Sequence, residues 1–308
     1  MKIITLTLNP AFDVHCRADE LALYRENLVE ITSRNAGGKG VNISRALAAG
    51  EIESRALVVL GDENGDTFLK SLYECGLDVL RIDVRGRIRE NITIHGCGGE
   101  TRISFSGFSA DGGLLSRVLS VLEEEAEDGF VVTFTGRVPD GIEASFVKEF
   151  LLRLKSLGAR LVIDSKSVSL SDIVEIKPWL IKPNREEISQ YLGREIFSFG
   201  EIRKSAEELH CAGVENVMVS LGEKGAMLVS REGSFIAVPK EISPLSTIGA
   251  GDSTVAGFMA ASCLGRPAAE CLKMAVAYGT AACLTEGTLP PRGEDIPVVL
   301  SEIKLERI

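Results

Sequence analysis

The sequence alternates short runs of apolar, largely β-branched residues with longer segments whose apolar residues recur at helical period. Between two of the short runs, residues 146–157 place their apolar side chains on one face of a predicted helix, which Gly158 ends. This alternation predicts an α/β fold in which a mostly parallel, Rossmann-type sheet carries helices on both faces. The short runs, each a predicted strand, are residues 3–8, 56–60, 130–134, 161–163, 179–181 and 217–219.

Two stretches, roughly residues 12–34 and 84–108, do not follow this rhythm. In the second, the alternating segments 92–94 and 103–105 lie among Gly96, Gly98, Gly99 and Gly107, as in hairpins inserted between βα units. Because the stretches are alike in pattern, we expect them to pair into one small sheet outside the main one. At 308 residues the chain is predicted to form a single large domain with this small appendage.

The composition limits the binding partners and the cellular location that can be expected for this protein. A formal charge of −10 disfavours nucleic acid and anionic membrane as partners, so an anionic substrate needs a local cluster of basic residues. No window approaches the ~18 uncharged apolar residues that cross a bilayer, and the start of the sequence carries no cleavage pattern of a signal peptide. Seven scattered cysteines without a Cys-x-x-Cys pair argue against disulfides and structural zinc. These features predict a cytoplasmic protein.

The strongest local motif is residues 246–253, Ser-Thr-Ile-Gly-Ala-Gly-Asp-Ser, followed by an apolar helical run from Val255 to Leu264. Gly249 and Gly251 at a loop-to-helix junction let backbone N–H groups converge on an anion, which the helix dipole also attracts. Asp252 in the same turn would oppose phosphate unless it takes the proton of an attacking hydroxyl, as phosphoryl transfer requires. The alternative is a tight glycine turn in which Asp252 only caps the helix.

A second glycine motif, residues 36–42 (Ala-Gly-Gly-Lys-Gly-Val-Asn), also leads into a predicted helix. Its glycines allow close approach of a ligand, Lys39 supplies a mobile charge, and the amide of Asn42 can meet a hydroxyl. It lacks the spacing of a P-loop, and a simple turn remains the alternative. Asp13 is expected where the first strand ends and ligands gather, either binding sugar hydroxyls or serving as a turn or cap residue.

The segment 179–187 ends another predicted strand with polar residues. Asn184 and Glu187 are three residues apart, on one face of an incipient helix, where they could order the waters around a magnesium ion that bridges phosphates. A helix cap, with Asn184 as N-cap and Glu187 reaching back to it, fits the same residues.

Taken together, these motifs resemble the ribokinase-like PfkB carbohydrate kinases. The resemblance rests on four segments in order: residues 37–42, Lys182-Pro-Asn-x-x-Glu187, Ser220-Leu-Gly222-x-x-Gly225 and Thr247-x-Gly-Ala-Gly-Asp252. The opening Thr7-Leu-Asn-Pro-Ala-x-Asp13 is similar to the branch that contains 1-phosphofructokinase and tagatose-6-phosphate kinase. The match extends over about residues 3–290.

The resemblance implies ATP and Mg²⁺ as cofactors and a β lid, formed by the two interrupting stretches, that in many relatives also makes a homodimer. It implies Asp252 as catalytic base, with the amides of Gly249, Ala250 and Gly251 stabilising the transferring phosphoryl group. The other roles that it implies are sugar binding by Asp13, Gly38, Lys39 and Asn42, nucleotide binding by Lys182, Asn184, Ser220, Gly222 and Gly225, and metal binding by Glu187 and, through water, Asn184.

A phosphorylated sugar needs a second anion site. Beside Lys39, the best candidate is Arg89, which matches a lid arginine of the family, and Arg102 on the neighbouring hairpin is a weaker candidate. Where the family usually has Gly-Ser-Leu-Pro, this chain has Gly136-Arg137-Val-Pro, so Arg137 could contact phosphate, point to solvent or block the usual substrate.

The predicted reaction is ATP-dependent phosphorylation of a ketohexose phosphate, with fructose 1-phosphate as first choice and tagatose 6-phosphate as runner-up. A dinucleotide-dependent oxidoreductase would suit the alternating architecture, but the first strand is not followed by Gly-x-Gly-x-x-Gly. A sugar or nucleotide sensor that lost turnover is a further alternative, against which Asp252 counts.

Overall fold

A computed structural model describes residues 1–96 and 99–308. Gly98 of the predicted hairpin and Cys97 lie outside the described residues. The main sheet has ten strands in the order β14-β13-β12-β11-β10-β9-β8-β1-β4-β5. The strands from β11 to β5 are parallel and comprise β1 (Ile3–Thr7), β4 (Arg55–Gly61), β5 (Asp78–Val84), β8 (Val131–Thr135), β9 (Arg160–Asp164), β10 (Leu180–Ile181) and β11 (Asn216–Ser220).

The antiparallel strands β12 (Ala226–Ser230), β13 (Gly233–Val238) and β14 (Lys304–Arg307) extend one edge of this sheet. Every short apolar run singled out in the sequence forms one of the parallel strands. The predicted α/β fold with a mostly parallel sheet is therefore confirmed.

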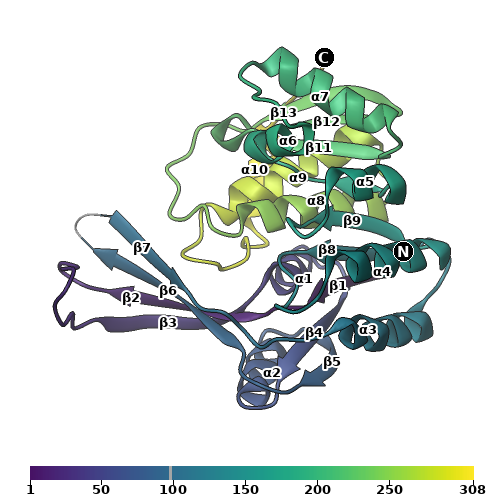
Figure 1. Ribbon diagram of the computed structural model, residues 1–308. Coiled ribbons are helices and arrows are strands. Elements are labelled where there is room, and N and C mark those ends of the chain that lie inside the picture. Colours follow the sequence, from purple (N-terminus) through teal and green to yellow (C-terminus); the bar gives the residue numbers. More distant parts are fainter. Residues whose placement is uncertain (97–98) are drawn as a thin grey trace.

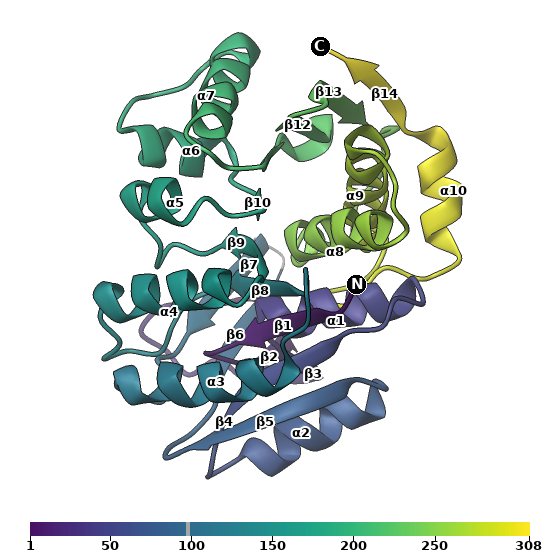
Figure 2. The ribbon, with the colours of Figure 1, turned by 90° about the vertical axis from the view of Figure 1, so that its right-hand side faces the viewer.

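Helices cover both faces of the main sheet, as Figure 2 shows. Because successive side chains of a strand point to opposite faces, β1 contributes Ile3 to one core and Ile4 and Leu6 to the other. One face carries α1 (Lys39–Ala49), α8 (Ala250–Cys263), α9 (Ala268–Ala282) and α10 (Asp295–Glu302). The other carries α3 (Gly112–Glu125), α4 (Ala144–Ser156), α5 (Leu170–Ile176), α6 (Arg185–Leu192) and α7 (Phe199–Cys211), while α2 (Gly65–Glu74) contacts β4 and β5.

A second, four-stranded sheet projects from this body (Figure 1) and is called the small sheet below. Its strand order is β3 (Glu30–Gly37), β2 (Ala11–Arg17), β6 (Arg89–Gly96) and β7 (Gly99–Ser104). The β2–β3 and β6–β7 pairs are antiparallel, and parallel pairing of β2 with β6 joins them. The two stretches that interrupt the βα rhythm are thus adjacent in one sheet.

The expected position of Asp13 is wrong. The first strand ends at Thr7, and Asp13 lies inside β2, opposite Asn91 of β6, rather than in a turn or cap. The short connection through Asn9 and Pro10 carries the chain out of the main sheet before β2 begins, so Asp13 belongs to the small sheet.

Within the described ranges, the protein has no helix that is both long and apolar enough to cross a membrane.

Candidate active site

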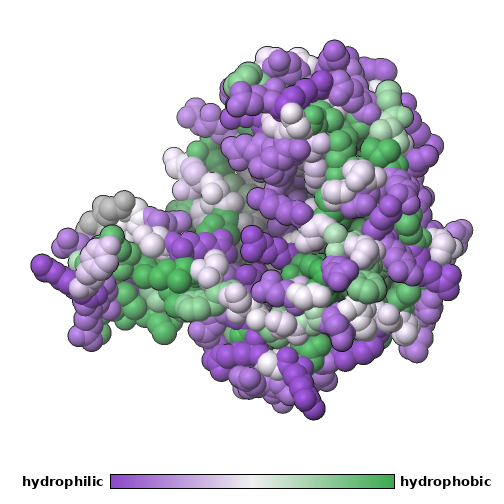
Figure 3. Space-filling model, in the orientation of Figure 1, coloured by the Kyte–Doolittle hydropathy of each residue, from purple (hydrophilic) through white to green (hydrophobic). Residues whose placement is uncertain are grey.

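A cavity of about 390 Å³ opens between the small sheet, the carboxyl ends of β8 and β9, and the amino end of α8. Figure 3 shows the molecular surface hollowed beside the projecting small sheet. Ala250 begins α8 between two of the lining glycines. The cavity brings together these predicted residues: Asp13, Gly38, Lys39, Asn42, Arg89, Arg102, Arg137, Lys182, Gly249, Gly251 and Asp252.

Asp252 lies in the first turn of α8 and is buried. Asn42 Nδ2, from α1, donates a hydrogen bond of 2.9 Å to Asp252 Oδ2. Burial raises the pKa of Asp252 from 3.8 to about 6, against the opposing effects of Lys39 and of the Asn42 hydrogen bond. A carboxylate with this pKa is mostly ionised at pH 7 yet able to accept a proton, as a general base must be.

The amino end of α8 is shaped to receive an anion. Gly249 precedes the helix in the left-handed region, with φ of 81°, which favours glycine there. A Cβ added at Gly251 would lie 3.2 Å from Lys182 Nζ, so the absence of a side chain lets this ammonium group approach the helix. Unpaired amides of the first turn and the nearby ammonium both favour negative charge at this point.

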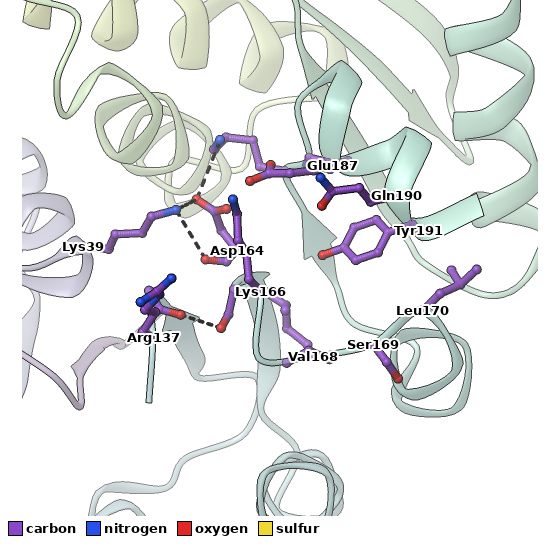
Figure 4. Close-up of a pocket in the computed structure, with 15 residues that line it drawn as sticks. Lys39, Arg137, Asp164, Lys166, Val168, Ser169, Leu170, Glu187, Gln190 and Tyr191 are labelled. Carbon is purple, nitrogen blue, oxygen red and sulfur yellow. Dashed lines mark hydrogen bonds and ion pairs between the residues drawn. The ribbon is translucent and has the colours of Figure 1, made fainter. Parts of the chain in front are cut away.

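Asp164, which the sequence analysis did not identify, joins the two lysines of the site. Its Oδ2 lies 2.8 Å from Lys39 Nζ (Figure 4) and 3.7 Å from Lys182 Nζ. Burial raises the pKa of Asp164, but Lys182 and Lys39 outweigh this and hold the pKa below its ordinary value. Its position directly after the predicted strand 161–163 was the available signal, because ligands collect at the carboxyl ends of parallel strands.

Lys39 is held at the amino end of α1. Gly38 before it has φ of 128°, and a Cβ there would lie 2.6 Å from the Thr7 side chain, so the turn requires glycine. Burial lowers the pKa of Lys39, but Asp164 and Asp252 outweigh burial and raise the pKa above its ordinary value. Lys39 is therefore a fixed positive charge between two carboxylates.

The three candidate arginines gather at the end of the cavity formed by the small sheet and the loop after β8. Arg89 is half-buried; burial lowers its pKa, Asp13 raises it, and the neighbouring charges of Arg137 and Arg102 lower it further. Arg102 Nη2 lies 3.7 Å from Asp13 Oδ1. Arg137 is exposed at the cavity wall. A cluster of cations in an acidic protein marks a place for an anion.

Several polar atoms of the lining residues are buried without a hydrogen-bond partner in the described chain. Buried polar groups are nearly always paired, so a group of unpaired ones in one cavity indicates a ligand with several polar groups. Asn91 shows the pattern, because its Nδ2 donates to Asp13 Oδ1 at 2.9 Å while its own Oδ1 has no partner. The unpaired atoms are Asn9 Oδ1, Asn42 Oδ1, Arg89 Nε, Asn91 Oδ1, Thr135 Oγ1 and Thr288 Oγ1.

The other predicted nucleotide residues lie outside this cavity. Asn184 and Ser220 form an isolated parallel bridge where β10 and β11 end, and with Gly222 they line a second cavity of about 430 Å³. Gly225 follows the 3₁₀ turn η1 (Gly222–Lys224) with φ of 83°, and its N–H donates to the Gly222 carbonyl. The predicted nucleotide residues are thus divided between two places. Lys182 lies beside Asp252, whereas Asn184, Ser220, Gly222 and Gly225 lie near the ends of β10 and β11.

Asn184 and Glu187 form a capping box at the start of α6. Glu187 N–H donates to Asn184 Oδ1 at 2.8 Å, and Asn184 N–H donates to Glu187 Oε2 at 3.0 Å. Glu187 also lines a cavity beside Lys182 and Asp164. Residues 1–96 and 99–308 contain no group of three or more His, Cys, Asp and Glu side chains able to hold a metal ion. A magnesium ion here would need phosphate oxygens and water to complete its shell.

Comparisons with known proteins agree with this geometry. Residues 10–294 match the family model described as "pfkB family carbohydrate kinase". The 1-phosphofructokinase of Escherichia coli strain K12 is 30% identical over 282 residues, 91% of this chain and 90% of the relative. The 1-phosphofructokinase of Bacillus subtilis strain 168 is 29% identical over 308 residues, 99% of this chain and 100% of the relative.

Among solved structures, phosphofructokinase-2 from Escherichia coli, in complex with substrates and products, superposes with a TM-score of 0.92. Its sequence is 26% identical, and the match covers 98% of this chain and 99% of that one.

Proposed function

Because this chain belongs to the pfkB family of carbohydrate kinases, we propose that it phosphorylates a ketohexose phosphate, with Asp252 as the base and fructose 1-phosphate as the acceptor. The family assignment makes the chain an ATP-dependent phosphotransferase acting on a sugar. The observation that carries the finer proposal is one cavity lined both by the buried carboxylate of α8 and by three arginines from the small sheet and the loop after β8.

In the proposed reaction, Asp252 accepts the proton of the attacking sugar hydroxyl as that oxygen bonds to the γ-phosphorus and ADP leaves. The amides of Gly249, Ala250 and Gly251 stabilise negative charge on the transferring phosphoryl oxygens, since they lie at the positive end of α8. Lys39 and Lys182, which both pair with Asp164, supply fixed positive charge on the same side of the cavity as these amides. Phosphoryl transfer depends mainly on such positioning and charge stabilisation.

The phosphate already on the sugar is assigned to Arg89, Arg102 and Arg137. Asp13, Asn42 and the amide region of Gly38 are assigned to the sugar hydroxyls, which could also satisfy the unpaired polar atoms of the cavity. A ketohexose phosphate has the phosphate at one end and a primary alcohol at the other, as this arrangement requires. Fructose 1-phosphate is the proposed acceptor because several relatives are named 1-phosphofructokinase. Another relative, phosphofructokinase-2 from Escherichia coli, has been solved in complex with fructose-6-phosphate, which is therefore included in the test below.

Magnesium is assigned to Glu187 and, through water, to Asn184. Their mutual bonds occupy one oxygen of each side chain, and the remaining acceptor capacity can meet the waters that Mg²⁺ usually retains. When bound, the ion would neutralise phosphate charge beside Lys182. Ser220, Gly222 and Gly225 are assigned to the nucleotide.

We also assign two roles to the small sheet: that of a lid over the sugar, and that of a homodimer interface. Exposed apolar side chains gather on it, which Figure 3 shows as green on the projecting lobe. One solved relative, phosphofructokinase-2 from Escherichia coli, has a tetrameric inhibited form. A monomeric mass in solution at micromolar concentration would rule out the dimer. The apolar side chains are Leu21, Leu23, Tyr24, Leu28, Ile31, Ile103 and Phe105.

The cytoplasm is the proposed location, because ATP is available there. The reducing cytoplasm also keeps thiols unpaired, as are six cysteines among the described residues: Cys16, Cys75, Cys211, Cys263, Cys271 and Cys283.

The substrate is tested by ADP release with Mg²⁺ and ATP across fructose 1-phosphate, tagatose 6-phosphate, fructose 6-phosphate, fructose and ribose. A clear preference for fructose 1-phosphate supports the proposal. Preference for another phosphorylated ketohexose replaces the substrate and keeps the site, while activity on unphosphorylated sugars alone contradicts the arginine site. Binding of ATP without turnover on any sugar points instead to a sensor.

A further inference from the structure

Two histidines and a glutamate form a line of side chains across the small sheet. His15 Nδ1 of β2 lies 3.0 Å from His95 Nε2 of β6, and the two rings stack with centroids 5.3 Å apart. His95 Nδ1 lies 3.2 Å from Glu100 Oε1 of β7. None of the three has a role in the phosphoryl transfer described above.

The contacts of this line assign the histidine tautomers. A carboxylate only accepts, so His95 Nδ1–H donates to Glu100 Oε1, and the neutral tautomer with this donor leaves His95 Nε2 to accept from His15 Nδ1–H. His15 Nε2 is then left as an acceptor, and it is buried with no partner in the described chain. Burial lowers the pKa of His15 and so does His95; Asp13 and Glu100 oppose them, and Arg102 adds to the lowering. The ring is therefore neutral at pH 7.

The unpaired nitrogen faces Gly287, in the segment between α9 and α10. A Cβ added at Gly287 would lie 2.9 Å from His15 Nε2, and the φ of this glycine is 58°. The next residue, Thr288, is buried in the wall of the sugar cavity, and its Oγ1 is also unpaired. Figure 1 shows this yellow segment approaching the small sheet. His15 is thus a contact between the small sheet and a wall of the cavity.

We propose that His15 is a positioning residue that docks the small sheet on the Gly287 turn and thereby holds Thr288 against the bound sugar phosphate. The inference rests on the proposed function, since it concerns the same cavity. A buried acceptor without a partner is destabilising, because the hydrogen bond that it made to water in the unfolded chain is not replaced. In the enzyme with sugar bound, His15 Nε2 accepts a hydrogen bond from the 286–288 segment, which removes this cost and links binding to docking.

Two variants of His15 separate this role from general support of the fold. His15→Phe keeps a ring but removes the acceptor, whereas His15→Gln places Oε1 near the position of Nε2. We expect His15→Phe to raise the KM for the sugar phosphate about tenfold, with the KM for ATP unchanged, and His15→Gln to recover most of the loss. Equal KM values for sugar phosphate in all three proteins, or equal losses for both substrates, would overturn the proposal.

Gly287→Ala tests the contact from the other side. Its Cβ would press on the imidazole, so we expect a rise in sugar-phosphate KM that exceeds the effect of backbone strain alone. Gly76→Ala is the matched control, because Gly76 has φ of 72° and an added Cβ would meet nothing within 4 Å. Adding His15→Ala to Gly287→Ala makes room for the Cβ, so the double variant should lose less than the sum of the single effects. Additive losses would contradict the contact.

Amide hydrogen exchange gives a readout that does not depend on turnover. With fructose 1-phosphate bound and no ATP present, His15→Phe should show faster exchange in residues 284–292 than the wild type, and Gly76→Ala should not. Unchanged exchange there would overturn the contact even if the kinase assay succeeds. If the wild type phosphorylates no sugar, the proposed function fails, while faster exchange in His15→Phe still establishes the docking.

Discussion

Asp164 Oδ2 lies 2.8 Å from Lys39 Nζ, which ties the amino end of α1 to the carboxyl end of β9. The same oxygen lies 3.7 Å from Lys182 Nζ. Asp164 and Lys182 are both buried, and Asp252 is the next carboxylate that faces Lys39. Asp164 therefore orders the two lysines of the site and leaves Asp252 free to act as the base.

Asp164→Asn is expected to disturb both stability and catalysis. Removing one partner of a buried ion pair leaves uncompensated charge, which typically costs about 3–5 kcal/mol. We expect a lower free energy of unfolding in urea and a fall in kcat/KM of at least about tenfold, because Lys39 and Lys182 lose their common anchor. Asp78→Asn is the control: Asp78 pairs with Arg55 on the surface and should change stability by less than about 1 kcal/mol. Similar losses in both variants would contradict the role of Asp164.

The pH dependence of turnover should report Asp252. Its pKa is raised to about 6 by burial, so kcat is expected to fall as pH drops below about 6 and the base becomes protonated. The hydrogen bond from Asn42 lowers this pKa, so Asn42→Ala should move the acidic limb of kcat to higher pH. Titration of the substrate phosphate would be the same in both proteins. An acidic limb at the same pH in both would contradict this origin.

Asp252 also predicts how stability depends on pH. Its folded pKa of about 6 lies above the ordinary 3.8, so the folded state binds more protons between these values and stability falls as pH rises through them. The destabilisation is complete above about pH 7 and amounts to roughly 3 kcal/mol. Asp252→Asn should therefore stabilise the protein against urea at pH 8 and much less at pH 4. Equal gains at the two pH values would show that the ionised carboxylate is not the cause.

Arg137→Ser restores the small hydroxyl that the resemblance leads one to expect at this position. If Arg137 contacts the sugar phosphate, the variant should raise the KM for that substrate about tenfold and leave the KM for ATP unchanged. Arg203→Ser, at a partly exposed arginine of α7 that pairs with Glu207, is the control. An unchanged KM for every hexose phosphate would place Arg137 outside the site.

The fold was predictable because its signals are local. Runs of β-branched residues and helical periods each lie within one element, and the second hairpin shows its alternation at residues 92–94 and 103–105. The position of Asp13 was not predictable in the same way, because nothing local marks where the chain leaves the main sheet for β2. Both readings of Asn184 and Glu187 fitted the sequence, and the capping bonds do form.

The site needed three-dimensional information. Asn42 and Asp252 are 210 residues apart, and their hydrogen bond follows from the packing of α1 against α8. Asp164 carried a positional signal at the end of a strand but belongs to no motif quoted above. The places of Asn91 and Thr288 in the site could not be predicted from the sequence, because they depend on how the small sheet and the segment after α9 meet at the cavity.

The central claim is that Asp252 removes the proton of the sugar hydroxyl, and turnover of Asp252→Asn tests it most directly. Asparagine keeps the shape of the side chain but cannot act as the base. The claim predicts that kcat with the preferred sugar phosphate falls at least about 100-fold while the Kd for ATP, measured by calorimetry, is preserved. Full kinase activity in this variant would contradict the claim.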